Sequence, residues 1–183
     1  MLLYTSGETV CTKSVIYRIP KELHVHRGRG TAMLLKKELI RVGIEAEDAE
    51  EALKTVAQGF VDNGYAKESF PQAVCDREVV YATGLPAIGM DIAIPHSDSI
   101  HVNQTCIGIA TLKTPVEFKM MGSPEITLHP KIFFMLAIAE AHAQIEMLQK
   151  LMGILQEEEL LKACYACTTP DEVYDLMAER IGE

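Results

Sequence analysis

Two apolar segments constrain the fold of this chain most strongly. Residues 105–112 read TCIGIATL and residues 131–139 read KIFFMLAIA, and both are rich in β-branched and aromatic side chains. Strands that are buried on both faces have this near-continuous apolar composition, whereas a strand with one solvated face alternates polar and apolar residues. The two segments therefore predict two buried strands at the centre of a sheet.

Segments with helical signals precede and follow these strands. Asp48 and Glu51 form the pattern of a capping box, and apolar side chains recur on one helical face after them. Ser69 and Pro71 begin a second expected helix, which continues through QAVCDREVV. TPDE at 169–172 is a third strong helix start. Helices that flank mostly buried strands predict a layered α/β domain.

Three weaker patterns complete the expected layout. The segment TGLPAIG at 83–89 is expected to be a loop, because it contains glycine and proline. TPVEF at 114–118 is expected to be an edge strand that begins at a proline. After Ala139 the period becomes helical, with one apolar stripe formed by Ile145, Leu148, Leu151, Met152 and Leu155.

Charge is unevenly distributed along the chain. The 183 residues have a formal net charge of −9, but residues 1–32 carry a net charge of +3 and residues 33–183 carry −12. Residues 1–32 show no clear periodicity, so we expect a compact domain at 33–183 and a basic N-terminal extension before it. The acidic balance argues against DNA or RNA as a partner, since phosphate backbones require a basic surface.

The cysteines and the lengths of the apolar runs indicate the cellular compartment of the protein. Five cysteines are scattered along the sequence, and this odd number is typical of reduced thiols in the cytosol. No apolar run reaches the length of about 20 residues that crosses a bilayer, and no signal-peptide pattern is present, so we expect a cytoplasmic protein. Cys164 and Cys167 form a C-x-x-C pair without a second such pair. We interpret them as small buried side chains rather than a redox or zinc site.

One histidine stands apart from the other five. In MDIAIPHSDSIHV, residues 90–102, an apolar strand ends at a proline and His96 follows directly. Pro95 has a fixed φ and lacks a backbone N–H, so the chain that enters His96 is held stiffly. Ligands gather at the carboxyl ends of strands in open α/β sheets. This frame suits a nucleophile whose direction of attack must be controlled; a structural histidine is the alternative.

A second histidine and an arginine are expected to share the site. His142 follows the strand at 131–139, and Arg77 closes the second helix. Imidazole has a pKa of about 6.5 and is available as a neutral nucleophile at pH 7, while guanidinium clamps phosphoryl oxygens in a bidentate manner. These groups favour phosphoryl transfer. Zinc binding is the rival interpretation, but His96 and His101 do not have the H-E-x-x-H spacing and no acidic or thiolate ligand is identifiable nearby.

These motifs resemble a known family. IAIPH after a glycine-containing segment, PVEF at 115–118 and a helix headed by His142 are similar to the type-2 EIIA domain of the bacterial sugar phosphotransferase system, in its fructose/mannitol group. REVVYATGLP at 77–86 and IAIPHSDSIHV look most similar to the galactitol-type branch. The resemblance covers residues 34–182. It implies a mixed β-sheet flanked by helices on both faces, with no cofactor and no metal.

The resemblance also implies a reaction and its partners. His96 matches the histidine that accepts a phosphoryl group from phospho-HPr and passes it to a cysteine of an EIIB component, with EIIC as the membrane component. His142 and Arg77 match the residues that steady the phosphoryl charge, and His101 is a possible lining residue. The expected function is that of a phosphoryl carrier for uptake of a polyol or sugar, galactitol-like in family. The alternative is a regulatory module that senses phosphorylation state without sugar transport.

Overall fold

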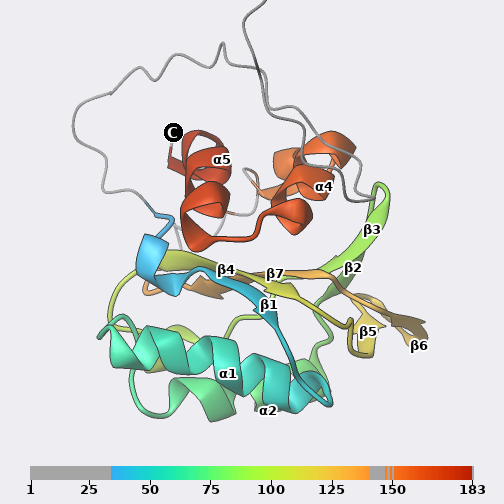
Figure 1. Cartoon of the computed structure of the whole chain (residues 1–183). Coiled ribbons are helices and arrows are strands. Elements are labelled where there is room, and N and C mark those ends of the chain that lie inside the picture. The colour runs from blue at the N-terminus through green and yellow to red at the C-terminus, as the bar shows by residue number, and fades with distance from the viewer. Residues whose placement is uncertain (1–33, 141–146, 148, 150, 183) are drawn as a thin grey trace, which may run out of the picture.

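The computed structural model of this chain describes residues 34–140, 147, 149 and 151–182 (Figure 1). At its centre is a seven-stranded sheet in the order β1-β4-β7-β3-β2-β5-β6. Along this order parallel and antiparallel neighbours alternate, so the sheet is mixed. The strands are β1 (Arg41–Ile44), β2 (Gly84–Ala87), β3 (Met90–Ala93), β4 (Cys106–Leu112), β5 (Phe118–Met120), β6 (Ser123–Leu128) and β7 (Ile132–Ala137).

Helices cover both faces of the sheet. Figure 1 shows α1 and α2 on one face and α4 and α5 on the other. The α/β class and the mixed sheet between helical layers are thus confirmed. Among the described residues, no helix is long and apolar enough to cross a membrane. The helices are α1 (Ala49–Asp62), α2 (Phe70–Val80), α4 (Glu158–Ala166) and α5 (Pro170–Gly182), with short 3-10 turns η1 (Lys37–Leu39) and η2 (Ser99–His101).

The two central strands separate two apolar cores. Every residue of β4 and β7 is buried, as the composition of these segments predicts. Phe134 packs in the core on the side of α4 and α5, whereas its neighbour Phe133 packs in the core beneath α1 and α2. Successive side chains of a strand point to opposite faces, so a strand that serves two cores must be apolar at every position.

Two of the three expected helix starts are confirmed in their hydrogen bonds, whereas α2 follows Ser69 with a proline in its first turn but without a hydrogen bond from the Ser69 side chain. Asp48 caps α1 and its side chain accepts a hydrogen bond from the backbone N–H of Glu51 at 2.9 Å. The Glu51 carboxylate reaches one residue further back than in a standard capping box, to the N–H of Glu47 at 2.8 Å. At α5 the box closes in both directions between Thr169 and Glu172, at 3.3 Å and 3.2 Å.

Two expected non-helical segments are wrong. Residues 84–87 of the expected loop TGLPAIG form β2, which pairs with β3 on one side and β5 on the other. Tertiary pairing overrides the local preferences of glycine and proline here. In the expected edge strand at 114–118 only Phe118 is in a strand. The strand at this edge of the sheet, beyond β5, is β6, and three of its six residues are exposed, so it carries little apolar pattern.

The expected apolar stripe after Ala139 is partly wrong. Residues 151–154 are helical, and Leu151 and Leu155 are buried as expected. Met152, however, is 51% exposed, and the buried position is taken by Ile154. Residues three and four positions after Leu151, which are Ile154 and Leu155, lie on the same face of a helix as Leu151. Met152 is one position after Leu151, so its side chain points away from the core. Ile145 and Leu148, like residues 1–32, lie outside the described residues.

Candidate active site

The β2–β3 hairpin brings His96 and the end of α2 to one rim of the sheet. β3 runs parallel to β7, so their carboxyl ends lie at the same edge. β2 runs antiparallel to β3 with Gly84 opposite Ala93, so β2 begins where β3 ends. Because α2 ends at Val80, only residues 81–83 separate it from β2. The last turn of α2 is therefore held near the segment that follows β3.

His96 is mounted on an extension of the sheet. The carbonyl of Pro95 accepts a hydrogen bond from the backbone N–H of Leu136 at 2.9 Å, and His96 forms an isolated parallel bridge with Leu136. A proline at this point lacks a donor, but its carbonyl still pairs with β7. The half-buried ring donates its Nδ1–H to the carbonyl of Ile94 at 2.9 Å. In the neutral ring this leaves the lone pair on Nε2.

The surroundings of His96 favour its neutral form. Burial is the largest cause, and it lowers the pKa of His96 below its ordinary value of about 6.5. The positive charge of Arg77 lowers this pKa further. The hydrogen bond to the Ile94 carbonyl and the negative charge of Asp98 act in the opposite direction. A neutral ring with a free Nε2 is the nucleophilic form of histidine.

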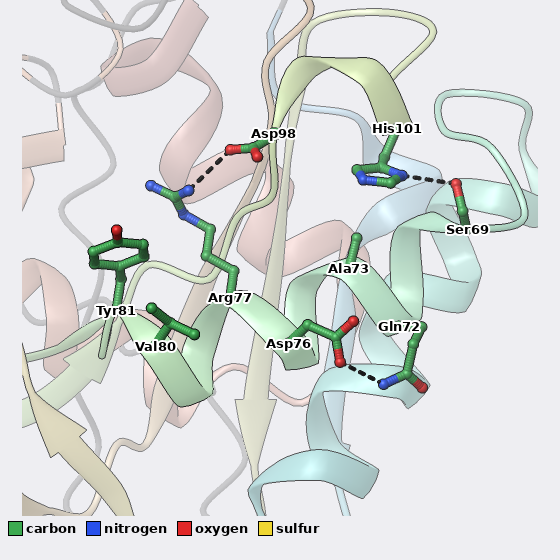
Figure 2. A pocket seen from close by; sticks show the side chains of 9 residues that line it. All are labelled: Ser69, Gln72, Ala73, Asp76, Arg77, Val80, Tyr81, Asp98 and His101. Carbon is green, nitrogen blue, oxygen red and sulfur yellow. Dashed lines mark hydrogen bonds and ion pairs between the residues drawn. The ribbon is translucent and has the colours of Figure 1, made fainter.

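Arg77 lies in the last turn of α2, as expected, and its charge reaches His96. Its Nη1 donates to Oδ1 of Asp98 at 2.9 Å, as Figure 2 shows. The guanidinium carbon also lies 5.3 Å from the ring centroid of Tyr81, one helical turn along the chain. Asp98 is the charged residue of this site that sequence reasoning missed. Its place two residues after His96 is the only local signal.

The neighbouring residue Glu78 ties α2 to β2. Its carboxylate accepts hydrogen bonds from the backbone N–H of Thr83, at 2.9 Å, and from the Thr83 hydroxyl. Thr83 is buried, and its own carbonyl accepts from the N–H of Ile94. Glu78 therefore links the helix that carries Arg77 to the chain that carries His96. Its pKa is raised by burial, and the two hydrogen bonds from Thr83 oppose this shift.

An open pocket of about 410 Å³ lies beside this site (Figure 2). His101 lines it, and its Nδ1 lies 2.8 Å from the Ser69 hydroxyl at the start of α2. His96 is not among the residues that line the pocket, although Arg77 and Asp98 are. The lining residues are Ser69, Gln72, Ala73, Asp76, Arg77, Val80, Tyr81, Asp98 and His101.

The expected place of His142 is not tested by the structure. His142 lies outside the described residues, so its place beside His96 stays a prediction.

The two cysteines of the C-x-x-C pair differ in burial. Cys164 is fully buried, and burial raises the pKa of its thiol to about 12. Cys167 is partly buried, and its thiol hydrogen-bonds to the carbonyl of Ala163 at 3.2 Å. Within the described part of the chain, no three His, Cys, Asp or Glu side chains form a group that could hold a metal ion.

Known proteins resemble this chain in sequence and in fold. Residues 33–180 match the family described as phosphoenolpyruvate-dependent sugar phosphotransferase system, EIIA 2. The galactitol-specific EIIA component of Escherichia coli K12 is 25% identical over 123 residues, which cover 67% of this chain and 81% of that protein. The transcriptional regulator ManR of Bacillus subtilis is 34% identical over 94 residues, covering 51% of this chain and 13% of the regulator.

A solved structure extends the likeness to three dimensions. The complex of mannitol-specific enzyme IIA with phosphorylated mannitol-specific enzyme IIB, from Escherichia coli, contains a chain that matches with a TM-score of 0.65 and 25% identity. The match covers 79% of this chain and 97% of that one. The fold and the sequence together define a phosphotransferase component. This chain belongs to the type-2 EIIA family of the sugar phosphotransferase system.

Proposed function

We propose that this protein is a cytoplasmic phosphoryl carrier in which His96 is the phosphorylated residue. In this proposal His96 accepts a phosphoryl group from phospho-HPr and passes it to a cysteine of an EIIB chain. The observation that carries the proposal is the hydrogen bond between Nδ1 of His96 and the carbonyl of Ile94, which leaves Nε2 as the nucleophilic atom. The solved complex of a related enzyme IIA with phosphorylated enzyme IIB supports EIIB as the acceptor.

The two transfer steps use the same nitrogen in opposite roles. In the first step the Nε2 lone pair attacks phosphorus, the P–N bond to the donor histidine breaks, and its electron pair returns to the donor ring. The His96 ring keeps its Nδ1–H, and the Ile94 carbonyl stabilises the positive charge that the ring acquires. In the second step a cysteine thiolate attacks phosphorus and the electron pair returns to Nε2. Imidazole suits both steps because it is both a nucleophile and a leaving group.

Arg77 and His142 are proposed to steady the phosphoryl group. Phosphoryl transfer depends on positioning and on compensation of charge spread over the phosphoryl oxygens. The guanidinium of Arg77 supplies positive charge at the rim where His96 lies, and its planar donors match phosphoryl oxygens. His142, from the segment after β7, is proposed to add a second donor. His101 is proposed as a lining residue only, since its Nδ1 pairs with Ser69.

Exposed apolar side chains around the site support protein partners. Val80 and Tyr81 line the pocket beside Arg77 and are 67% and 64% exposed. Ile100, next to His101, is 68% exposed. Apolar side chains gathered near a reactive residue are typical of a contact surface for another protein, and carriers need small, transient interfaces. The sugar would be selected by the membrane component EIIC, and we propose a polyol or sugar of the galactitol type from the relatives alone.

Labelling with phospho-HPr tests the proposal. Wild-type protein should acquire one acid-labile phosphoryl group, and His96→Ala should remove the label entirely. His129→Ala is the matched control, because its side chain is exposed on the chain before β7 and has no proposed role. His142→Ala should slow labelling without abolishing it. Label that survives His96→Ala would refute the assignment of the nucleophile.

A regulatory role is the second candidate function. The similarity to the regulator ManR favours it, since that match is 34% identical over 94 residues. The same site would then report phosphorylation state without moving sugar. An EIIB chain encoded beside this gene, mixed with the phosphorylated protein, should take up the label if the protein serves transport. Failure of that transfer, with labelling of His96 intact, would favour the regulatory role.

We also propose that the compact domain spans residues 33–183 and that residues 1–32 form a basic extension. The family match begins at residue 33, which is compatible with this division. Limited proteolysis should cleave within residues 1–32 first and leave a fragment that still accepts label. Protection of residues 1–32 from cleavage would contradict the division.

A further inference from the structure

Asp98 contacts the cationic group of the candidate site. Its Oδ1 lies 2.9 Å from Nη1 of Arg77, across the pocket between α2 and the segment after β3 (Figure 2). The Asp98 side chain is 72% exposed and that of Arg77 is 29% exposed. Nε of Arg77 is buried and has no hydrogen-bond partner among the described residues. The guanidinium thus gives one donor to Asp98 and keeps a buried donor unused.

Both charges act on the ring of His96. Arg77 and Asp98 shift its protonation in opposite directions, so both lie within electrostatic reach of the imidazole. A phosphoryl group brings a charge of about −1.5 to −2 at pH 7. On Nε2 it would attract the guanidinium of Arg77 and repel the carboxylate of Asp98. The phosphoryl group and Asp98 therefore compete for the same cation.

We propose that Asp98 is a positioning residue that acts through Arg77 and limits the stability of phosphorylated His96. The carboxylate holds the guanidinium at the rim before transfer and shares it with the phosphoryl group afterwards. The inference rests on the proposed function, because it presupposes a phosphoryl group on His96.

A carrier benefits from such a limit. An interaction that stabilises the phosphorylated intermediate promotes loading but makes onward transfer less favourable, since only stabilisation of the transition state speeds both steps. Arg77 alone would stabilise the phosphoryl group in the intermediate as well as in the transition state. Asp98 opposes the stabilisation of the intermediate, because its carboxylate repels the phosphoryl group and competes with it for the guanidinium of Arg77. The phosphoryl group then stays easy to pass to an acceptor.

Asp76 provides a matched control. It lies beside Arg77 in α2 and lines the same pocket, but its Oδ1 accepts a hydrogen bond from Nε2 of Gln72 at 2.8 Å. Asp76→Asn removes the same unit of negative charge as Asp98→Asn, from the same pocket, without removing the hydrogen bond between Arg77 and Asp98. A comparison of the two variants therefore distinguishes an effect of the Arg77–Asp98 ion pair from an effect of the net charge of the pocket.

The test measures the equilibrium between phospho-HPr and the full-length chain. In the Asp98→Asn variant we expect the equilibrium to shift toward the phosphorylated protein about three- to tenfold, a modest effect because the pair is partly exposed. The shift should shrink as salt is raised, because salt screens exposed charges. Asp98→Glu retains the carboxylate and should return the equilibrium toward the wild-type value. The NMR signal of the Arg77 Nε–H should move on phosphorylation of the wild type.

A second phosphoryl donor separates failure of this inference from failure of the proposed function. Phosphoramidate can load His96 without a protein partner: the Nε2–P bond forms, the donor P–N bond breaks and ammonia leaves. The wild type should then give phosphohistidine at residue 96 by ³¹P NMR. If it does not form from either donor, the proposed function fails. If it forms, and Asp98→Asn shifts the equilibrium no more than Asp76→Asn, the role of Asp98 is overturned.

Discussion

The Nδ1–H of His96 donates to the backbone carbonyl of Ile94, two residues earlier, at 2.9 Å. The acceptor is fixed because the peptide N–H of the same residue, Ile94, donates to the carbonyl of Thr83 in the neighbouring strand connection. Within the described part of the chain, the ring is therefore oriented by backbone atoms rather than by another side chain. This relationship determines which nitrogen can react.

We expect phosphorylation of His96 to occur on Nε2. Nδ1 carries the proton that the Ile94 carbonyl accepts, so only Nε2 offers a lone pair in the neutral ring. The measurement is ¹⁵N–³¹P coupling in protein labelled with ¹⁵N-histidine. A phosphoryl group found on Nδ1 would require the ring to leave this hydrogen bond, and would contradict the geometry described above.

His96 should titrate below the ordinary range of histidine. Burial lowers its pKa from about 6.5, so the unfolded chain takes up the proton before the folded protein does. The free energy of unfolding should therefore fall as pH drops from about 6.5 through the pKa of the folded state. Urea denaturation at several pH values, compared with His96→Gln, measures this contribution. The proton signals of the ring give its pKa directly, and a pKa above 6.5 would be inconsistent with burial of the ring.

Arg77→Ala should slow labelling of His96 about 30- to 1,000-fold while leaving the fold intact. The reason is the loss of a positioned donor for transition-state charge, which costs about 2–4 kcal/mol. The same variant should raise the pKa of His96, because the charge of Arg77 lowers it. Arg77→Lys retains the charge but not the planar fork, so it should keep the pKa low while still slowing transfer. Equal rates for the wild type and Arg77→Ala would remove Arg77 from the mechanism.

The sequence predicts the central strands and the mount of His96 because these depend on local signals. β4 and β7 are apolar at every position, and the proline before His96 marks a strand end whatever surrounds it. Helix starts such as that of α5 also follow from nearby residues, as the contacts between Thr169 and Glu172 demonstrate. These elements can be recognised without knowledge of the fold.

The partners of the site could not be predicted in the same way. The segment 84–87 becomes a strand only because β3 and β5 offer their edges, and nothing in its glycine and proline content indicates this. When this segment is expected to be a loop, the sequence does not predict that β2 pairs with β3 and thereby holds the end of α2 near His96. The pair between Arg77 and Asp98 depends on the same hairpin and joins residues 21 positions apart. A carboxylate two residues after a histidine has no pairing partner that the sequence alone identifies.

Glu78→Ala should destabilise the protein by about 1–3 kcal/mol, because it leaves the buried N–H and hydroxyl of Thr83 without their acceptor. Glu78→Gln should cost less, since an amide oxygen can still accept one of these bonds. Urea denaturation measures both changes, and Glu68→Ala, at an exposed position before α2, is the control.

The ionisation of Glu78 gives this prediction a second readout. Its pKa is raised by burial, so its contribution to stability is fully present below about 4.5 and is lost as pH rises through the raised pKa. Glu78→Gln should abolish that part of the pH dependence. The assignment fails if the wild type and Glu78→Gln have parallel stability curves across this window.

Gly108→Ala should destabilise the protein by about 1–3 kcal/mol through overpacking. Gly108 lies in β4 beneath α1, and a Cβ atom there would come within 2.8 Å of the Phe60 ring and 2.9 Å of the Leu39 carbonyl oxygen. The carbonyl belongs to the backbone, so the contact cannot be relieved by a side-chain rotation alone.

Gly153→Ala is the matched control for Gly108→Ala. None of the described residues lies within 4 Å of its added Cβ, and alanine in a helix is favoured over glycine by about 0.5–1 kcal/mol. The midpoint temperature of thermal unfolding should therefore fall for Gly108→Ala and rise for Gly153→Ala. A neutral Gly108→Ala would mean that α1 can shift away from the sheet, in which case the spacing between α1 and β4 is softer than the contacts of Gly108 imply.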